Sequence, residues 1–175
     1  MRIKLLLSFL FLGFIGSIYS CSLDESAPND ILIYASDINN IEYVQKAINQ
    51  GADINSQADG YTALMGSALR GHEAIVKLLL ENNANPNIQN HEGETALMLA
   101  VDMEYENIVK LLLDAGALIG TALNKANGQG YDSIAKLIAA EIEKRKIRTK
   151  KEIVETACLL PELADIVLEY VNYPT

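Results

Sequence analysis

The chain has 175 residues, 50% of them hydrophobic, which suits one domain with a sizeable apolar core. Its formal net charge of −9 at pH 7 argues against nucleic acid as a partner, because binding to phosphates needs a basic face. Its two cysteines, Cys21 and Cys158, are too few for a disulfide framework. We expect Cys158, which lies among apolar residues, to be buried.

Residues 1–20 are predicted to be a secretory signal. Arg2 and Lys4 precede an apolar run from residue 5 to residue 15, which is shorter than the about 20 residues that a membrane-spanning helix needs. The Ile-Tyr-Ser segment before Cys21 resembles the cleavage site of bacterial lipoproteins. That resemblance implies an exported bacterial protein, anchored in a membrane through a lipidated Cys21. Ordinary cleavage, leaving a periplasmic or secreted chain with a free Cys21, and an uncleaved anchor are the alternatives.

Residues 21–29 form a polar leader that we expect to act as a flexible tether. Residues 30–140 then repeat at a spacing of 33 positions. Thr-Ala-Leu-Met occurs twice, beginning at Thr62 and Thr95, and Ile-Val-Lys-Leu-Leu-Leu occurs twice, beginning at Ile75 and Ile108. A shift of 32 backwards and a shift of 26 forwards each find a weaker copy. The sequence therefore predicts about four units, with degenerate first and last copies.

Each unit predicts two short helices joined by a turn. The Thr-Ala-Leu-Met block suits a first helix of two turns, and the Ile-Val-Lys-Leu-Leu-Leu block gives a second helix with apolar residues at helical spacing. We expect the second helices to end at Gly51, Asn83 and Gly116, because glycine, and less often asparagine, adopts the left-handed conformation that ends a helix. A polar, turn-rich segment leads into the next pair.

This arrangement resembles the ankyrin-repeat family. The resemblance rests on the Gly-x-Thr-Ala-Leu-Met block, the Ile-Val-Lys-Leu-Leu-Leu run and a Gly/Asn-Ala-x-x-Asn tail, and it covers roughly residues 30–140. It implies an all-α solenoid of stacked helix–turn–helix units with short β-fingers. Both Thr-Ala-Leu-Met blocks carry Ala and Met where the family usually has Pro and His. The fourth unit is seven residues short, so we expect it to lack its finger and keep its helix pair.

In ankyrin stacks the finger tips and the open face of the first helices contact partner proteins. Carried over by position, the resemblance implies ten partner-binding residues: Ala58, Asp59, Tyr61, Leu69 and Arg70 in the second unit, and His91, Glu92, Glu94, Asp102 and Met103 in the third. Tyr61 and Arg70 are the strongest anchor candidates, because such side chains often dominate interface energies. The alternative is that these positions are merely solvated and keep the chain soluble.

The sequence predicts no catalytic residue, metal ligand, cofactor or small-molecule substrate. His91 and Glu92 begin like a zinc-protease motif, but Thr95 follows where the motif continues and no second histidine stands nearby. A phosphate loop, a nucleophile elbow and a Cys/His cluster are all missing from the sequence. We expect His72, at the turn between two helices, to have a structural role. The partner implied is another protein, and a factor that shields a periplasmic partner is one further hypothesis.

Residues 141–175 are predicted to form capping helices at the end of the stack. Six basic residues lie between Lys144 and Lys151, which predicts either a solvated helix surface or a patch for anionic lipid. Thr149 and Glu152 have the spacing of a capping box, which predicts that a new helix begins there.

A last helix is expected to begin at Pro161, with its apolar residues in one stripe that packs against the fourth unit. The stripe consists of Leu163, Ile166, Val167, Tyr170 and Val171. The same Leu-Pro-Glu-Leu segment resembles the opening helix of an F-box, the adaptor-binding module of ubiquitin ligases. That resemblance implies an alternative function, a secreted host-directed effector. The preferred hypothesis is a non-enzymatic, exported protein–protein interaction module.

Overall fold

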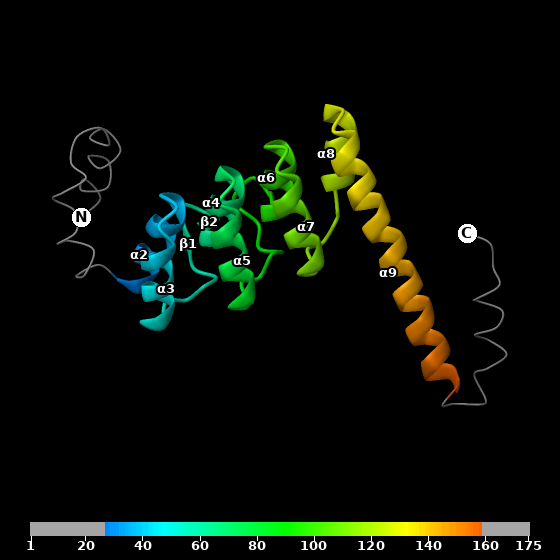
Figure 1. Ribbon diagram of the computed structural model, residues 1–175, viewed down its shortest axis with the longest axis horizontal. Coiled ribbons are helices and arrows are strands. Elements are labelled where there is room, and N and C mark those ends of the chain that lie inside the picture. The colour runs from blue at the N-terminus through cyan, green and yellow to red at the C-terminus, as the bar shows by residue number, and fades with distance from the viewer. Residues whose placement is uncertain (1–26, 159–175) are drawn as a thin grey trace.

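The computed structural model describes residues 27–158 of the chain (Figure 1). The predicted signal with Cys21 and the predicted last helix from Pro161 onward lie outside the described residues. Within that range eight helices and one β-hairpin follow one another. Their bounds are α2 Pro28–Asp37, α3 Ile41–Asn49, β1 Gln57–Ala58, β2 Tyr61–Thr62, α4 Ala63–Arg70, α5 Glu73–Glu81, α6 Ala96–Asp102, α7 Glu106–Asp114, α8 Ala122–Gln129 and α9 Asp132–Cys158.

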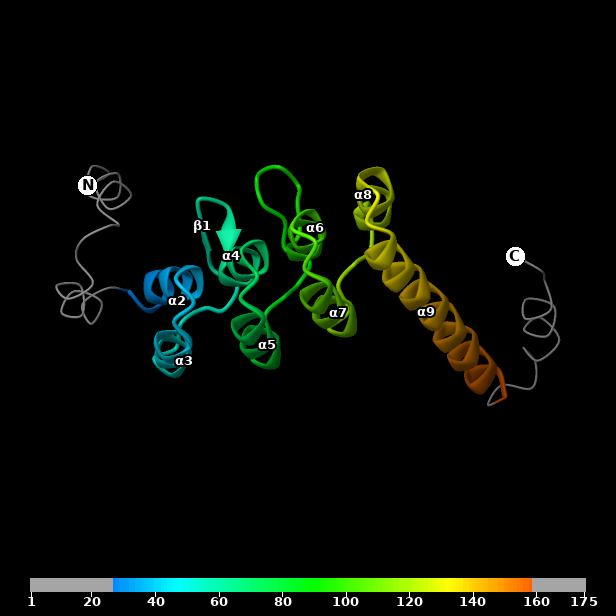
Figure 2. The same cartoon turned by 45° about the horizontal axis from the view of Figure 1, so that its top comes forward.

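The helices form a stack of four antiparallel hairpins, as the sequence predicted. In both Figure 1 and Figure 2 the first helices, α2, α4, α6 and α8, form one row. The second helices, α3, α5, α7 and the start of α9, form a second row beside it. Each first helix contacts the first helix of the next hairpin, so every unit packs mainly on its neighbours. The all-α repeat solenoid is therefore confirmed.

Threonines begin the first helices of the second and third units. The Oγ1 atom of Thr62 accepts a hydrogen bond from the backbone N–H of Met65 at 3.2 Å, and that of Thr95 accepts one from Met98 at 3.4 Å. These bonds satisfy N–H groups that have no partner within the helix. Thr121, at the matching place in the fourth unit, is in a helical conformation and makes no such bond.

The second helices end where the sequence predicted. Gly51, Asn83 and Gly116 have φ values of 84°, 64° and 84°, in the left-handed region. Beyond each end, a backbone N–H donates to an asparagine side chain that lies earlier in the chain, and we call these bonds the asparagine ladder. Its bonds run from Asp53 N to Asn29 Oδ1 (2.7 Å), from Asn85 N to Asn55 Oδ1 (2.8 Å) and from Leu118 N to Asn87 Oδ1 (2.7 Å). The tail asparagines Asn55 and Asn87 therefore hold the tail of the next unit, whereas Asn29 belongs to α2 and holds the tail of its own unit.

The core runs continuously through the stack. In the repeated Ile-Val-Lys-Leu-Leu-Leu run the two isoleucines, Ile75 and Ile108, are buried, whereas Lys77 and Lys110 point to solvent. Met65 is only 1% exposed, so the residue that replaces the family's usual histidine serves as packing. Each large apolar side chain buried in this way stabilises the fold by about 1.5–3 kcal/mol.

A finger connects the first and second hairpins. Its strands pair antiparallel, with Gln57 opposite Thr62 and Ala58 opposite Tyr61. Asp59 and Gly60 form the two-residue turn, and both have positive φ, as such turns require. A second finger, residues 86–95, precedes α6 and is closed by a backbone bond from the Asn90 N–H to the Glu94 carbonyl at 2.9 Å. Residues 115–121 alone connect α7 to α8, whereas residues 82–95 connect α5 to α6, so the shortened fourth unit keeps its helix pair and lacks a finger, as expected.

The predicted capping box at Thr149 is wrong. α9 is one continuous helix of 27 residues, and it runs through the boundary that we expected after residue 140. Thr149 lies inside it and donates its hydroxyl to the carbonyl oxygen of Arg145 at 3.0 Å. The sequence around Thr149 consists mainly of Lys, Arg, Glu and Ile, without glycine or proline, so nothing in it stops the helix. Figure 1 shows α9 continuing past α7 on the side of the second helices.

Arg145 locks α9 against the end of α7. Its guanidinium donates to the carbonyl oxygens of Leu113 (2.8 Å) and Ala117 (2.9 Å), which lie at the C-terminus of α7. It also donates to Glu141 Oε1 at 2.9 Å. This hydrogen bond is the main cause that lowers the pKa of the Glu141 carboxyl below its usual value. One member of the basic stretch therefore serves as a helix cap from a neighbouring helix.

Candidate functional site

The ten predicted partner-binding residues lie on the two fingers and on the C-terminal ends of α4 and α6. We call this surface the finger face. In Figure 2 both fingers stand on the same side of the stack, beside the first helices. Six of the ten side chains are exposed: Ala58, Asp59, Arg70, His91, Glu92 and Met103. The other four are partly buried: Tyr61, Leu69, Glu94 and Asp102.

The two fingers are stacked against each other. The Gln57 side chain donates to the carbonyl of Gly60 at 2.8 Å, in its own finger, and to the carbonyl of Gln89 at 3.1 Å, in the next. The ring of His91 lies directly over Gly60, where an added Cβ atom would stand 2.6 Å from the His91 Cδ2 atom. Only glycine fits at that position, because any side chain would displace the ring. His91 therefore packs between the fingers and also contributes to the exposed surface.

Asn90 shapes the second finger. It is only 7% exposed, and its Oδ1 atom accepts bonds from the backbone N–H groups of Glu92 (2.9 Å) and Glu94 (2.8 Å). A buried amide that satisfies two turn N–H groups fixes the loop between them. The sequence prediction passed over Asn90, although asparagine three residues before a glycine is a typical turn signal.

Three of the predicted residues form ion pairs between units. Arg70 pairs with Asp37 of the first unit. Glu94 and Asp102 both pair with Lys125 of the fourth unit, whose Nζ atom lies 3.0 Å from Glu94 Oε1. Burial alone would lower the pKa of Lys125, but the hydrogen bonds and charges of Asp102 and Glu94 outweigh burial and raise the pKa above its usual value. These ion pairs join neighbouring units, whether or not the same side chains also contact a partner protein.

The remaining exposed side chains are free to meet a partner. Asp59 and Glu92 form no ion pair within the described residues, and they flank the exposed imidazole of His91. Met103, at the end of α6, is 46% exposed. The face thus offers two unpaired carboxylates, one aromatic ring and one flexible apolar side chain. Such a mixture suits a partner that presents basic and apolar groups.

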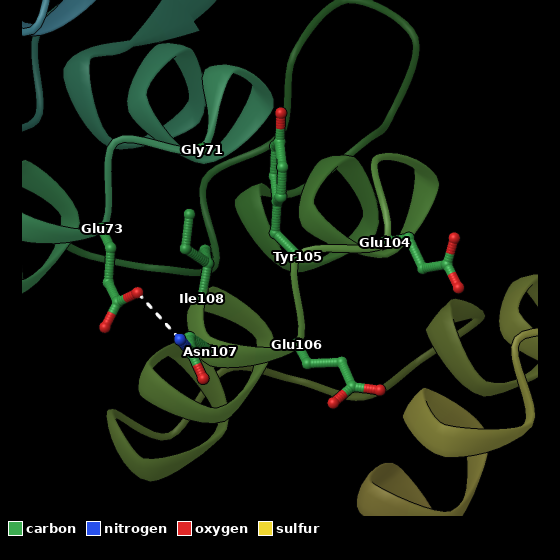
Figure 3. A pocket seen from close by; sticks show the side chains of 7 residues that line it. All are labelled: Gly71, Glu73, Glu104, Tyr105, Glu106, Asn107 and Ile108. Atoms are coloured by element: carbon green, nitrogen blue, oxygen red, sulfur yellow. Dashed lines mark hydrogen bonds between the residues drawn. The ribbon is translucent and has the colours of Figure 1, made fainter.

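A shallow pocket of about 330 Å³ adjoins the finger face at the turns of the second and third hairpins (Figure 3). The ring of Tyr105 packs over Gly71, where an added Cβ atom would stand 2.7 Å from the ring. Around it lie Glu73, Glu104 and Glu106, and the Asn107 side chain donates to Glu73 Oε2 at 3.0 Å. The sequence prediction did not include these residues. The pocket extends the acidic character of the finger face toward the second helices.

His72 has the structural role that we expected. Its Nε2 atom lies 3.1 Å from the carbonyl oxygen of Asp37, so it bridges the first and second units. Between residues 27 and 158, no group of three or more His, Cys, Asp or Glu side chains is placed to hold a metal ion. None of the helices in this range is long and apolar enough to cross a membrane.

Comparison with known proteins supports the same repeat fold. The family model for ankyrin repeats, in three copies, matches residues 31–122. A bovine mitochondrial disaggregase is 32% identical over 72 residues, which is 41% of this chain and 11% of the bovine protein. The human mitochondrial disaggregase matches at the same identity over 10% of its length. The mouse ankyrin repeat domain-containing protein 40 is 32% identical over 77 residues, or 43% of this chain and 21% of the mouse protein.

The chain therefore spans no more than about a fifth of the length of these curated relatives. The family model, in contrast, covers more than half of the chain, and the fourth hairpin continues the same stack beyond it. The chain belongs to the ankyrin-repeat family, whose stacked hairpins generally mediate binding to other proteins.

Proposed function

We propose that this chain is a non-enzymatic scaffold that binds another protein through the finger face and is exported and held at a membrane by Cys21. The observation that carries the binding surface is the pair of stacked fingers. Gln57 and the His91–Gly60 contact hold the fingers together, while Asp59 and Glu92 stay exposed and unpaired at their tips. A preorganised surface loses little conformational entropy on binding.

The partner should present basic and apolar groups. Residues 27–143 carry 6 basic and 16 acidic side chains, so the whole stack is strongly negative. Glu94 and Asp102 pair with Lys125, whereas Asp59 and Glu92 have no ion-pair partner among the described residues. A basic partner would be attracted to this field, and association should weaken as salt is added.

The proposal for export and tethering rests on the N-terminal sequence. A short basic start, an apolar run and the Ile-Tyr-Ser-Cys junction support cleavage before Cys21 and lipidation of its thiol.

Photo-crosslinking tests the binding surface. A photoreactive residue in place of Asp59 or Glu92 should crosslink a partner in intact cells. The matched controls are Lys77 and Lys110, which are exposed on the second helices, away from the fingers. An adduct from the finger positions alone supports the proposal, and Met103→Asp should then weaken that adduct. Equal adducts from Lys77 and Lys110 would show that the binding surface lies elsewhere.

A further inference from the structure

The end of α9 extends beyond the rest of the stack. From Arg145 onward the helix continues for 13 residues, which corresponds to about 20 Å at 1.5 Å per residue. We call residues 146–158 the α9 extension. Every residue from Lys146 to Glu152 is exposed, and these seven residues cover all sides of the helix. The extension therefore has no side packed against the ankyrin units over these two turns.

One side of the extension combines an exposed apolar residue with basic residues. Ile147 is 69% exposed, the highest value among the exposed large apolar side chains of the described chain. At 100° per residue it lies on the opposite side of the helix from Arg145, which faces the stack. Lys150 and Lys151 follow at i+3 and i+4, so they stand next to Ile147 on the same side.

The charge of this end is opposite to that of the stack. Residues 144–153 contain six basic side chains and one acidic side chain. Lys144, Arg145 and Lys146 pair with acids of α9 or α7. Arg148 and Lys150, by contrast, make no ion pair with any described residue. Arg148 and Lys150, together with the exposed isoleucine, are side chains through which a helix can contact an anionic membrane surface.

The place of the cations matters as much as their charge. Arg148 and Lys150 lie three and five residues beyond Arg145, which contacts α7, and this corresponds to about 4.5 and 7.5 Å along the helix. They therefore stand beyond the end of the packed stack, where a flat surface can reach them. We propose that the α9 extension binds the surface of an anionic lipid membrane, with Ile147 entering the headgroup region and the flanking cations contacting the lipid phosphates.

Binding of the α9 extension to a membrane would fix the orientation of the stack relative to the lipid surface. In Figure 1 and Figure 2 the extension points to the side of the second helices, whereas the fingers stand on the other side. A membrane bound at the extension would leave the finger face turned away from the lipid. The inference thus goes beyond the proposed partner binding and requires neither a partner nor lipidation of Cys21.

Vesicle binding of the full chain tests the inference. The chain carries Cys21→Ser, so that acylation plays no part, and is added to phosphatidylcholine vesicles with or without about a third phosphatidylglycerol. The apolar N-terminal run would bind both kinds, so the measured quantity is the ratio of the two affinities. Each cation at an anionic surface contributes roughly 5-fold, so Arg148→Gln with Lys150→Gln should lower that ratio by roughly 25-fold.

The matched control removes two cations elsewhere. Lys77→Gln with Lys110→Gln makes the same change in net charge on the second helices, and it should leave the ratio nearly unchanged. The preference for anionic vesicles should also weaken as salt rises from low to physiological. Equal effects of the two double variants, or no preference for anionic vesicles at low salt, would overturn the proposal.

A fluorescent probe reports on the extension itself. The chain contains no tryptophan, so Ile147→Trp introduces a unique indole at the proposed point of contact. Its emission should shift to the blue when anionic vesicles are added, and that of Lys77→Trp should not. An unchanged spectrum would contradict insertion. A blue shift that depends on protein concentration without vesicles would instead assign the extension to a second copy of the chain, which also overturns the proposal.

Discussion

Arg145 offers the sharpest test of how the end of the stack is held. Replacing it with methionine keeps most of its aliphatic length and removes the guanidinium that donates to Leu113 O, Ala117 O and Glu141 Oε1. Hydrogen bonds that involve a charged group contribute about 1.5–3 kcal/mol each. The Arg145 side chain is 29% exposed, and water can replace part of what is lost. We therefore expect Arg145→Met to lower the free energy of unfolding by about 2 kcal/mol.

Urea unfolding followed by circular dichroism measures this loss, which corresponds to about 4–8 °C in melting temperature for a chain of this size. Lys146→Met is the matched control. Lys146 is the next residue and, among the described residues, pairs with the exposed Glu143 alone, at 2.9 Å, so its removal should cost less than about 0.5 kcal/mol. Arg145→Lys should cause an intermediate loss of stability. The lysine ammonium keeps the positive charge, but it lacks the planar set of N–H donors with which the guanidinium reaches several oxygen atoms at once. Equal losses from Arg145→Met and Lys146→Met would refute the idea that Arg145 caps α7.

Four further outcomes are expected. The lowered pKa of Glu141 means that its stabilising effect is present above its usual pKa of 4.5 and is lost as pH falls through the lowered value. The stability difference between native and Arg145→Met chains should therefore shrink in acid but not vanish, because the bonds from Arg145 to the carbonyls of Leu113 and Ala117 remain. The raised pKa of Lys125 has the opposite sign. Its contribution is present below pH 10.5 and is lost above it, so Lys125→Met, roughly 1 kcal/mol less stable at pH 7, should lose this deficit in strong alkali. Gly60→Ala should cost about 1–3 kcal/mol in urea, and less in a chain that also carries His91→Ala, because the clash is then relieved. Radioactive palmitate should label the native chain in cells but not Cys21→Ser, and an unlabelled native chain would remove the proposed anchor.

The hairpins could be predicted from the sequence because each is determined by local chemistry that occurs more than once. Gly51, Asn83 and Gly116 differ in position but share one conformational requirement, so aligning the repeats revealed all three helix ends. The absence of a finger in the fourth unit could be predicted because that unit is seven residues shorter than the others. These features depend on residues within one unit and its immediate neighbour.

The features that the sequence did not reveal are contacts that occur only once. Lys125 has no equivalent in the other units, yet it reaches back to Glu94 and Asp102, and no periodicity indicates that pairing. The ten candidate residues were placed by family position, and their role in binding stays a prediction. Thr149 and Glu152 match a capping box in spacing, but the same spacing is compatible with a helix interior when strong helix formers surround it.

The asparagine ladder has a consequence for how the protein opens. Two of its bonds tie a backbone amide of one unit, at Asn85 or Leu118, to an asparagine side chain of the unit before it, whereas the bond from Asp53 to Asn29 lies within the first unit. Separation of two units breaks one of the two bonds between units, whereas fraying elsewhere in the stack leaves them intact. The exchange of the Asn85 and Leu118 amide hydrogens with deuterated solvent therefore reports on the first and second junctions separately, and that of Asp53 serves as a reference within the first unit. Their relative rates would show whether the stack opens from one end, one junction at a time, or as a single cooperative body.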